Sequence, residues 1–118
     1  MRKAGAVFEE RAHGELTRAG LKLLERNYTT RYGELDLVMR DGEVIVFVEV
    51  RHRVRAGHGD AIASITATKQ SRLIQTAQLW LAAHPQHAHR ACRFDVVSYD
   101  GPVDNASMNW LRSAFEAA

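Results

Sequence analysis

The sequence has little cysteine and no long apolar run. Its single cysteine, Cys92, cannot form an internal disulfide, which is typical of chains kept in a reducing compartment. The longest uninterrupted apolar stretch, Val44 to Val48, is too short to cross a bilayer, and Met1-Arg2-Lys3 leads into no apolar signal-peptide core. We therefore expect a cytoplasmic protein that does not associate with a membrane.

The sequence also lacks a strong excess of charge of either sign. Sixteen lysines and arginines against fourteen acidic residues give a formal net charge of +2. The isoelectric point is about 9.0, a weak indication of a polyanionic partner. With 118 residues, 46% of them hydrophobic, the chain can bury one core, and we expect one domain over residues 1–118.

The spacing of apolar residues predicts helices alternating with strands. Steps of three and four predict amphipathic helices over Ala6 to Glu25 and Ser64 to Ala83. Runs of β-branched and aromatic residues predict strands over Asn27 to Arg40, Val44 to Val50 and Ala91 to Tyr99. This order of elements indicates an α/β fold.

Two segments have too few apolar anchors to be assigned to the core. His52 to Asp60 contains glycine, Arg53 and Arg55, so we expect an exposed basic loop that contacts phosphate. The residues after Tyr99 are expected to form a loop and a short terminal helix.

The dipeptide Asp41-Gly42 predicts a two-residue hairpin turn. Pairing outward from this turn places Glu34 opposite Glu49 and Asp36 opposite Phe47. Side chains alternate along a strand, so one face is expected to carry Glu34, Asp36, Phe47, Glu49 and Arg51, and the other Leu35, Leu37, Val48 and Val50. Asp36 and Glu49 would be diagonal neighbours, roughly 7–8 Å apart, and could share a divalent cation.

Two helical residues are expected to reach the same acidic face. Glu9 precedes Ala12 and Leu16 on the inward stripe of the first helix, where a carboxylate needs a partner. Lys69 lies on the corresponding stripe of the second helix, where it either approaches the acidic face or a phosphate, or extends to solvent with its stem packed.

These residues occur within motifs that resemble a known family. The motifs are Gly5-x-x-x-Glu9-x-x-Ala12, Arg26-Asn27, Gly33-Glu34-Leu35-Asp36-Leu37, Val46-Phe47-Val48-Glu49-Val50-Arg51, Lys69-Gln70 and Arg93-Phe94-Asp95-Val96-Val97. In this order they resemble the YraN-like bacterial family of predicted endonucleases, which is related to archaeal Holliday-junction resolvases. The resemblance extends from Gly5 to about Phe115.

The resemblance implies a restriction-endonuclease-like fold, with a mixed central sheet between helices and a PD-(D/E)-x-K motif. It implies catalytic roles for Glu9, Asp36, Glu49 and Arg51, with Mg²⁺ or Mn²⁺ held by the three acids. Substrate contacts are assigned to Arg53, Arg55, Lys69 and Gln70. The expected partner is nucleic acid, DNA rather than RNA, and a homodimer is possible by analogy with junction-acting nucleases.

Arg51 stands where the resembled motif usually has lysine. Arginine can grip a phosphate with two hydrogen bonds, but it stays protonated and cannot act as a base. A protein that binds nucleic acid without cleaving it is therefore the alternative interpretation.

Most of the other notable residues are expected to have structural roles. Asp95 is expected to form an ion pair with Arg93, and Glu34 is a second-rank metal ligand. His84, His87 and His89 are assigned to a solvated helix end, Trp80 to the core, and Cys92 to an inert core position. Trp110 is left open between packing and base stacking.

Overall fold

The structure is a computed structural model that describes residues 4–54 and 65–117. Its elements, in chain order, are α1 (Ala4–Arg18), β1 (Lys22–Thr30), β2 (Gly33–Asp41), β3 (Val44–Arg53), α2 (Ala67–Ala83), the short 3₁₀ helix η2 (Pro85–His87), β4 (Cys92–Asp100), the 3₁₀ helix η3 (Val103–Asn105) and β5 (Ser107–Phe115).

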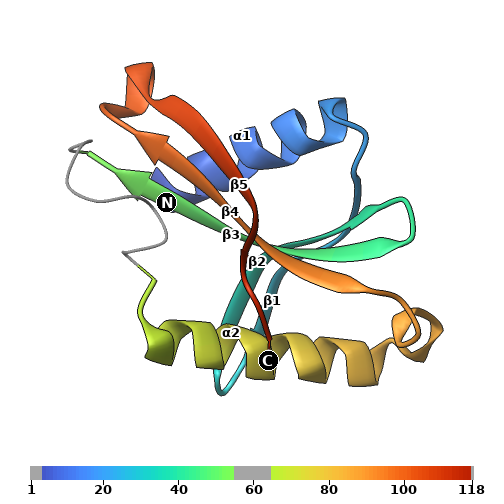
Figure 1. Ribbon diagram of the computed structural model, residues 1–118. Helices are drawn as coiled ribbons and strands as arrows, with labels where there is room; N and C mark the ends of the chain where they lie inside the picture. The colour runs from blue at the N-terminus through green and yellow to red at the C-terminus, as the bar shows by residue number, and fades with distance from the viewer. Residues whose placement is uncertain (1–3, 55–64, 118) are drawn as a thin grey trace.

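The five strands form one mixed sheet in the order β1-β2-β3-β4-β5. Neighbouring strands are antiparallel except β3 and β4, which are parallel because α2 carries the chain back between them. Helix α1 lies on one face of the sheet and α2 on the other (Figure 1). The expected α/β architecture of three layers is confirmed.

Each face of the sheet packs on one helix. The α1 side buries Phe8, Ala12 and Leu16 of the helix against residues that include Leu37, Met39, Val46, Val48, Val97 and Tyr99. The α2 side buries Leu73, Ala77 and Trp80 against residues that include Leu35, Val38, Ile45, Phe47, Phe94 and Val96. A sheet buried on both faces explains the valine-rich run in β3.

The first helix is shorter than the predicted span Ala6 to Glu25. It ends at Arg18, where Gly20 takes a φ of 103° and the N–H of Leu21 donates to the carbonyl of Leu16. Leu23, assigned to the helical stripe, lies in β1. The residues from Asn27 to Arg40 are not one strand, because a turn at Arg31 and Tyr32 divides them between β1 and β2.

The β2–β3 hairpin turns one residue later than predicted. Asp41 pairs with Val44, so the two-residue loop is Gly42-Glu43, with Gly42 at a φ of 59°. Asp41 is held in the strand, where its carboxylate pairs with Arg93 at 3.0 Å. Across the hairpin the pairing is therefore displaced by two residues, and such an even displacement leaves the alternation of side chains unchanged.

The predictions for the loop after β3 and for the C-terminal segment are also corrected. His52 and Arg53 belong to β3, and Arg55 lies outside the described residues. The C-terminal segment forms the edge strand β5 instead of a terminal helix. An irregularity between Phe94 and Val96 breaks the pairing of β5, and Ser113 has a φ of 50°, so the apolar residues of this strand do not alternate regularly.

Candidate functional site

The hairpin pairing ends where the candidate site begins. Leu37 and Val48 are the last paired residues of β2 and β3 on this side, and continuing the register by one step places Asp36 opposite Glu49. The N–H of Val50 donates to Oδ2 of Asp36 at 2.9 Å, so a side-chain oxygen replaces a backbone carbonyl as the partner of β3. Asp36 is thereby fixed between two separating strands.

The regular alternation predicted for β2 is wrong at this point. Leu35 packs on the α2 side of the sheet, whereas Leu37 packs on the α1 side. Two residues separated by one position would share a face in a regular strand, so the strand is irregular around Asp36. The diagonal arrangement expected for Asp36 and Glu49 is accordingly replaced by a direct contact, in which the two carboxyl groups can share a hydrogen bond.

Three carboxylates converge beside this irregularity. Oxygens of Glu9, Glu34 and Asp36 all lie within 4.8 Å of one another. Glu9 comes from α1, as the inward stripe predicts, and the other two come from β2. Glu34, ranked below the other acids in the sequence analysis, is part of this acidic cluster and also accepts a hydrogen bond from Thr29 at 3.1 Å. Glu49, the other predicted ligand, touches the cluster through Asp36.

Burial and neighbouring charges raise the pKa values of two carboxyl groups of the acidic cluster, Asp36 and Glu9. Burial, followed by the charge of Glu49 and more weakly that of Glu9, raises the pKa of Asp36 to about 8, although the Val50 N–H opposes the shift. Burial and the charge of Glu34 likewise raise the pKa of Glu9, against the opposing charge of Arg26. The site therefore takes up a proton at neutral pH unless another positive charge replaces it.

Glu49 is buried and paired with two basic side chains. Its side chain is only 6% exposed, and Oε2 lies 3.2 Å from Nζ of Lys69 and 3.6 Å from a terminal nitrogen of Arg51. Lys69 lies in the first turn of α2, and its N–H donates to the N-cap residue Thr66 at 3.1 Å. Helix α2 thus directs a lysine toward the acidic residues from the side opposite α1, as expected from the sequence.

A small cleft adjoins the acidic cluster between the β1–β2 turn and α2. Its volume is about 100 Å³, and it is lined by Tyr32, Gly33, Glu34, Lys69, Arg72 and Leu73. Two of its lining residues are cationic and one is a member of the acidic cluster. The sequence analysis missed Arg72, because an arginine on the exposed face of an amphipathic helix carries no distinguishing pattern.

Two predicted substrate-binding residues have structural partners. Arg53 forms a two-point ion pair with Asp100, with distances of 2.8 and 3.0 Å, so it stabilises the parallel β3–β4 pair. Its assignment to an exposed loop is therefore wrong. The side-chain nitrogen of Gln70 donates to the carbonyl of Ile65 at 3.2 Å, next to the start of α2.

The structural interpretation of Asp95 is confirmed. Its buried carboxylate accepts hydrogen bonds from Arg93, from the indole of Trp110 and from the backbone of Ser113, each at 3.0 Å. Trp110 therefore has a packing and hydrogen-bonding role.

The remaining residues lie away from the acidic cluster. Trp80 is in the core, stacked on His84 with ring centroids 4.0 Å apart. Cys92 is exposed, not in the core, because β4 begins there at the rim of the sheet. Burial of its sulfur nevertheless raises the pKa of the Cys92 thiol, which keeps it protonated.

The fold and site together define an α/β protein whose mixed sheet carries a carboxylate cluster at the point where two antiparallel strands separate. Residues 8–99 match the family described as "Uncharacterised protein family UPF0102", and the chain belongs to this family. Among its relatives, a UPF0102 protein from Stutzerimonas stutzeri is 48% identical over 97% of this chain and 95% of its own length. Another from Alkalilimnicola ehrlichii is 53% identical over 98% of this chain and 88% of its own length.

The names of these two relatives give the family and state no activity. The described residues contain no helix that is long and apolar enough to span a membrane.

Proposed function

We propose that this protein is a nuclease of the YraN-like, restriction-endonuclease-like type that uses Mg²⁺ or Mn²⁺ to hydrolyse DNA phosphodiesters. The main support is that oxygens of the Glu9, Glu34 and Asp36 carboxylates lie within 4.8 Å of one another, next to the Glu49–Lys69 ion pair. Acidic oxygens gathered beside cationic groups are what hydrolysis of a phosphodiester with a hard cation requires.

The chemistry of the donors fits a divalent cation. All three carboxylates offer oxygen ligands, which Mg²⁺ and Mn²⁺ prefer over softer metals. Burial, followed by the charge of Glu49 and more weakly that of Glu9, raises the pKa of Asp36 to about 8, and a cation in place of the proton would relieve the repulsion between these carboxylates. Glu9, Glu34 and Asp36 are the proposed ligands.

A cation held by Glu9, Glu34 and Asp36 would lower the pKa of a coordinated water and would polarise the scissile phosphate. The chain's own residues then stabilise the developing negative charge. Lys69 and Arg51 donate to phosphoryl oxygens, while Glu49 positions both of them through Oε2. Arg51 remains protonated, so it has an electrostatic role and does not remove a proton from water.

The cleft between Tyr32 and Arg72 is the proposed site for a phosphate next to the scissile one. Lys69 and Arg72 line it, and Tyr32 presents an aromatic ring, with the Arg31 guanidinium 4.9 Å from the ring centroid. A basic surface interleaved with an aromatic ring suits a nucleic-acid strand, through phosphate contacts and base stacking. This surface replaces Arg53 in the proposed interface.

The second candidate function is nucleic-acid binding without cleavage, and Arg51 favours it. Both basic neighbours of Glu49 are held in ion pairs, and an arginine cannot accept a proton from water. Under this hypothesis the acidic cluster repels phosphate, and neutral variants bind nucleic acid more tightly than the wild type.

Cleavage assays separate the two functions. The protein is incubated with duplex, flap, single-stranded and four-way DNA and with RNA, in Mg²⁺, in Mn²⁺ and in chelator. Nuclease function predicts metal-dependent cleavage that Asp36→Asn and Glu9→Gln abolish. The matched control is Asp104→Asn, since Asp104 is an exposed acid of η3 outside the site. Absence of cleavage on every substrate, with tighter binding by Asp36→Asn, would support the binding function instead.

A further inference from the structure

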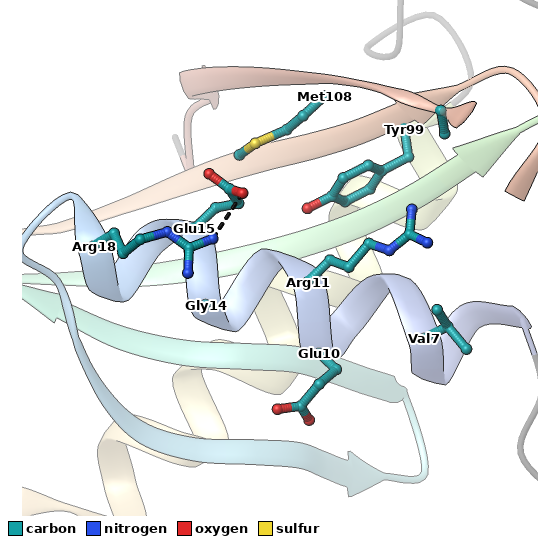
Figure 2. A pocket seen from close by; sticks show the side chains of 9 residues that line it. Val7, Glu10, Arg11, Gly14, Glu15, Arg18, Tyr99 and Met108 are labelled. Carbon is teal, nitrogen blue, oxygen red and sulfur yellow. Dashed lines mark hydrogen bonds and ion pairs between the residues drawn. The ribbon is translucent and has the colours of Figure 1, made fainter. Parts of the chain in front are cut away.

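A second hollow lies on the other flank of α1, between that helix and the β4–β5 pair (Figure 2). Its volume is about 580 Å³, and its lining includes two acids, two arginines, Val7, Tyr99 and Met108, the charged residues being Glu10, Arg11, Glu15 and Arg18. Successive residues of an α-helix are rotated by about 100°, so Arg11 and Glu9 project from opposite sides of the stripe that packs on the sheet. This α1–β4 groove is therefore separate from the acidic cluster.

The groove contains a buried hydroxyl without a hydrogen-bond partner. Tyr99 is 3% exposed, its ring packs 4.8 Å from that of Phe8, and its hydroxyl oxygen has no partner among the described residues. Figure 2 shows the hydroxyl directed toward α1, in the region of Arg11 and Glu15. Buried hydroxyls are nearly always hydrogen-bonded, because an unsatisfied one destabilises the folded state. A bound ligand would supply the hydrogen-bond acceptor that this hydroxyl lacks.

The groove also contains a guanidinium without a carboxylate partner. Arg11 lies 4.9 Å from the centroid of the Phe8 ring, and within the described parts of the chain no acidic oxygen is within 4.0 Å of it. The neighbouring Arg18 is bound to Glu15 at 2.8 Å in an exposed pair. Such a pair is weak, so a competing anion could engage Arg18 at little cost.

The hydroxyl can act only as a donor to such an anion at neutral pH. Burial, followed by the charge of Glu15, raises the pKa of Tyr99 to about 12, so the phenol keeps its proton. Arg11 offers further donors and no acceptor. The Arg11 guanidinium therefore selects a ligand oxygen that carries negative charge, and the Tyr99 hydroxyl donates to a lone pair of the same ligand. Val7 and Met108 provide apolar contact surface beside them.

We propose that the α1–β4 groove binds a small organic anion, a carboxylate or phosphate ester with a short apolar portion. The Tyr99 hydroxyl and the Arg11 guanidinium donate to the anionic oxygens, and Val7 and Met108 contact the apolar portion. A volume of about 580 Å³ suits a small molecule. The proposal does not depend on nuclease activity.

The test uses phenyl phosphate and benzoate as anionic probes and benzyl alcohol as a neutral one. Titration calorimetry on the full chain should show saturable binding of at least one anion. The probe that binds more tightly shows whether the groove prefers a phosphate ester or a carboxylate. Arg11→Gln should weaken that binding about tenfold, as expected for loss of a charged hydrogen-bond donor, and Tyr99→Phe by several-fold.

Arg112→Gln is the matched control. It removes an arginine that also lies over an aromatic ring, at 4.1 Å from the Trp110 centroid, but outside the groove. The affinity of the Arg112→Gln variant for the probes should equal that of the wild type. Tyr99→Phe deletes only the unsatisfied oxygen and should fold with a melting temperature at least as high as the wild type.

Any one of four results would overturn the proposal. One is no saturable binding of either anion at millimolar concentration. Another is equal affinity in the wild type, Arg11→Gln and Tyr99→Phe, and the third is benzyl alcohol binding as tightly as the anions. Displacement of the probe by duplex DNA, with loss of DNA affinity in Arg11→Gln, would assign the groove to a nucleic-acid interface and also reject the small-molecule ligand.

Discussion

Replacing Asp36 by asparagine should stabilise the metal-free protein at neutral pH. Folding raises the pKa of Asp36 from 3.8 to about 8, so at pH 7 the native state holds a proton that the unfolded chain has released. Protonating this carboxyl group at pH 7, about three pH units above its pKa in the unfolded chain, costs roughly 4 kcal/mol, at about 1.4 kcal/mol per unit. Asparagine is neutral in both states and avoids this cost.

The direction of the pKa shift determines how the stabilisation by Asp36→Asn depends on pH. A carboxyl group whose pKa is raised on folding contributes most to stability below its unfolded pKa of 3.8, and that contribution is lost as the pH rises toward about 8. The free energy of unfolding of Asp36→Asn should therefore be close to that of the wild type at acidic pH and exceed it by a few kcal/mol at pH 7. The asparagine oxygen can still accept the hydrogen bond from Val50.

The assay is urea unfolding in chelator at a series of pH values from 4 to 8. Fluorescence of Trp80 reports the transition, since this side chain is 1% exposed in the fold. Asp104→Asn, which removes an exposed acid, should follow the wild type at every pH. A difference between Asp36→Asn and the wild type that does not change with pH, or a less stable variant at pH 7, would refute the electrostatic reasoning.

Three further changes have defined outcomes. Asp95→Ala should lower the free energy of unfolding by about 3–5 kcal/mol in urea denaturation, because it leaves Arg93 and the Trp110 indole without their buried partner, whereas Asp104→Ala should have little effect. Lys69→Met should cost about 1–3 kcal/mol by removing the shorter of the two ion pairs of buried Glu49, and a matching Glu49→Gln change should restore most of the loss. Mg²⁺ at a hundredfold excess over its Kd should stabilise the wild type by about 2.7 kcal/mol in thermal unfolding and leave Asp36→Asn unchanged.

The sequence was sufficient to locate the acidic residues because helical and strand periods constrain side-chain direction. Glu9 interrupts an apolar stripe, and that stripe packs on the sheet through Phe8, Ala12 and Leu16. The same reasoning placed Lys69 on the side of α2 that approaches Glu49. Both inferences depend only on local periodicity, which survives small errors in the position of a turn.

Features that depend on tertiary contacts were not predictable from local patterns. The hairpin turn is shifted because Asp41 pairs with Arg93, a residue 52 positions away. The Arg53–Asp100 pair joins parallel strands that α2 separates in sequence, so it left no local signal. Strand β5 could not be predicted because the bulge at Ser113 interrupts its alternation, and the proximity of Glu34 to Glu9 and Asp36 depends on an irregularity at Asp36 that has no local signal in the sequence.

The proposed nuclease function requires that Glu9, Glu34 and Asp36 hold a divalent cation. The most direct measurement is an anomalous difference map from crystals of the protein grown with Mn²⁺, collected for the wild type and for Asp36→Asn. We expect one strong peak bounded by oxygens of these three residues in the wild type, and its loss in the variant. A map without a peak there at saturating Mn²⁺, or an equal peak in Asp36→Asn, would contradict it.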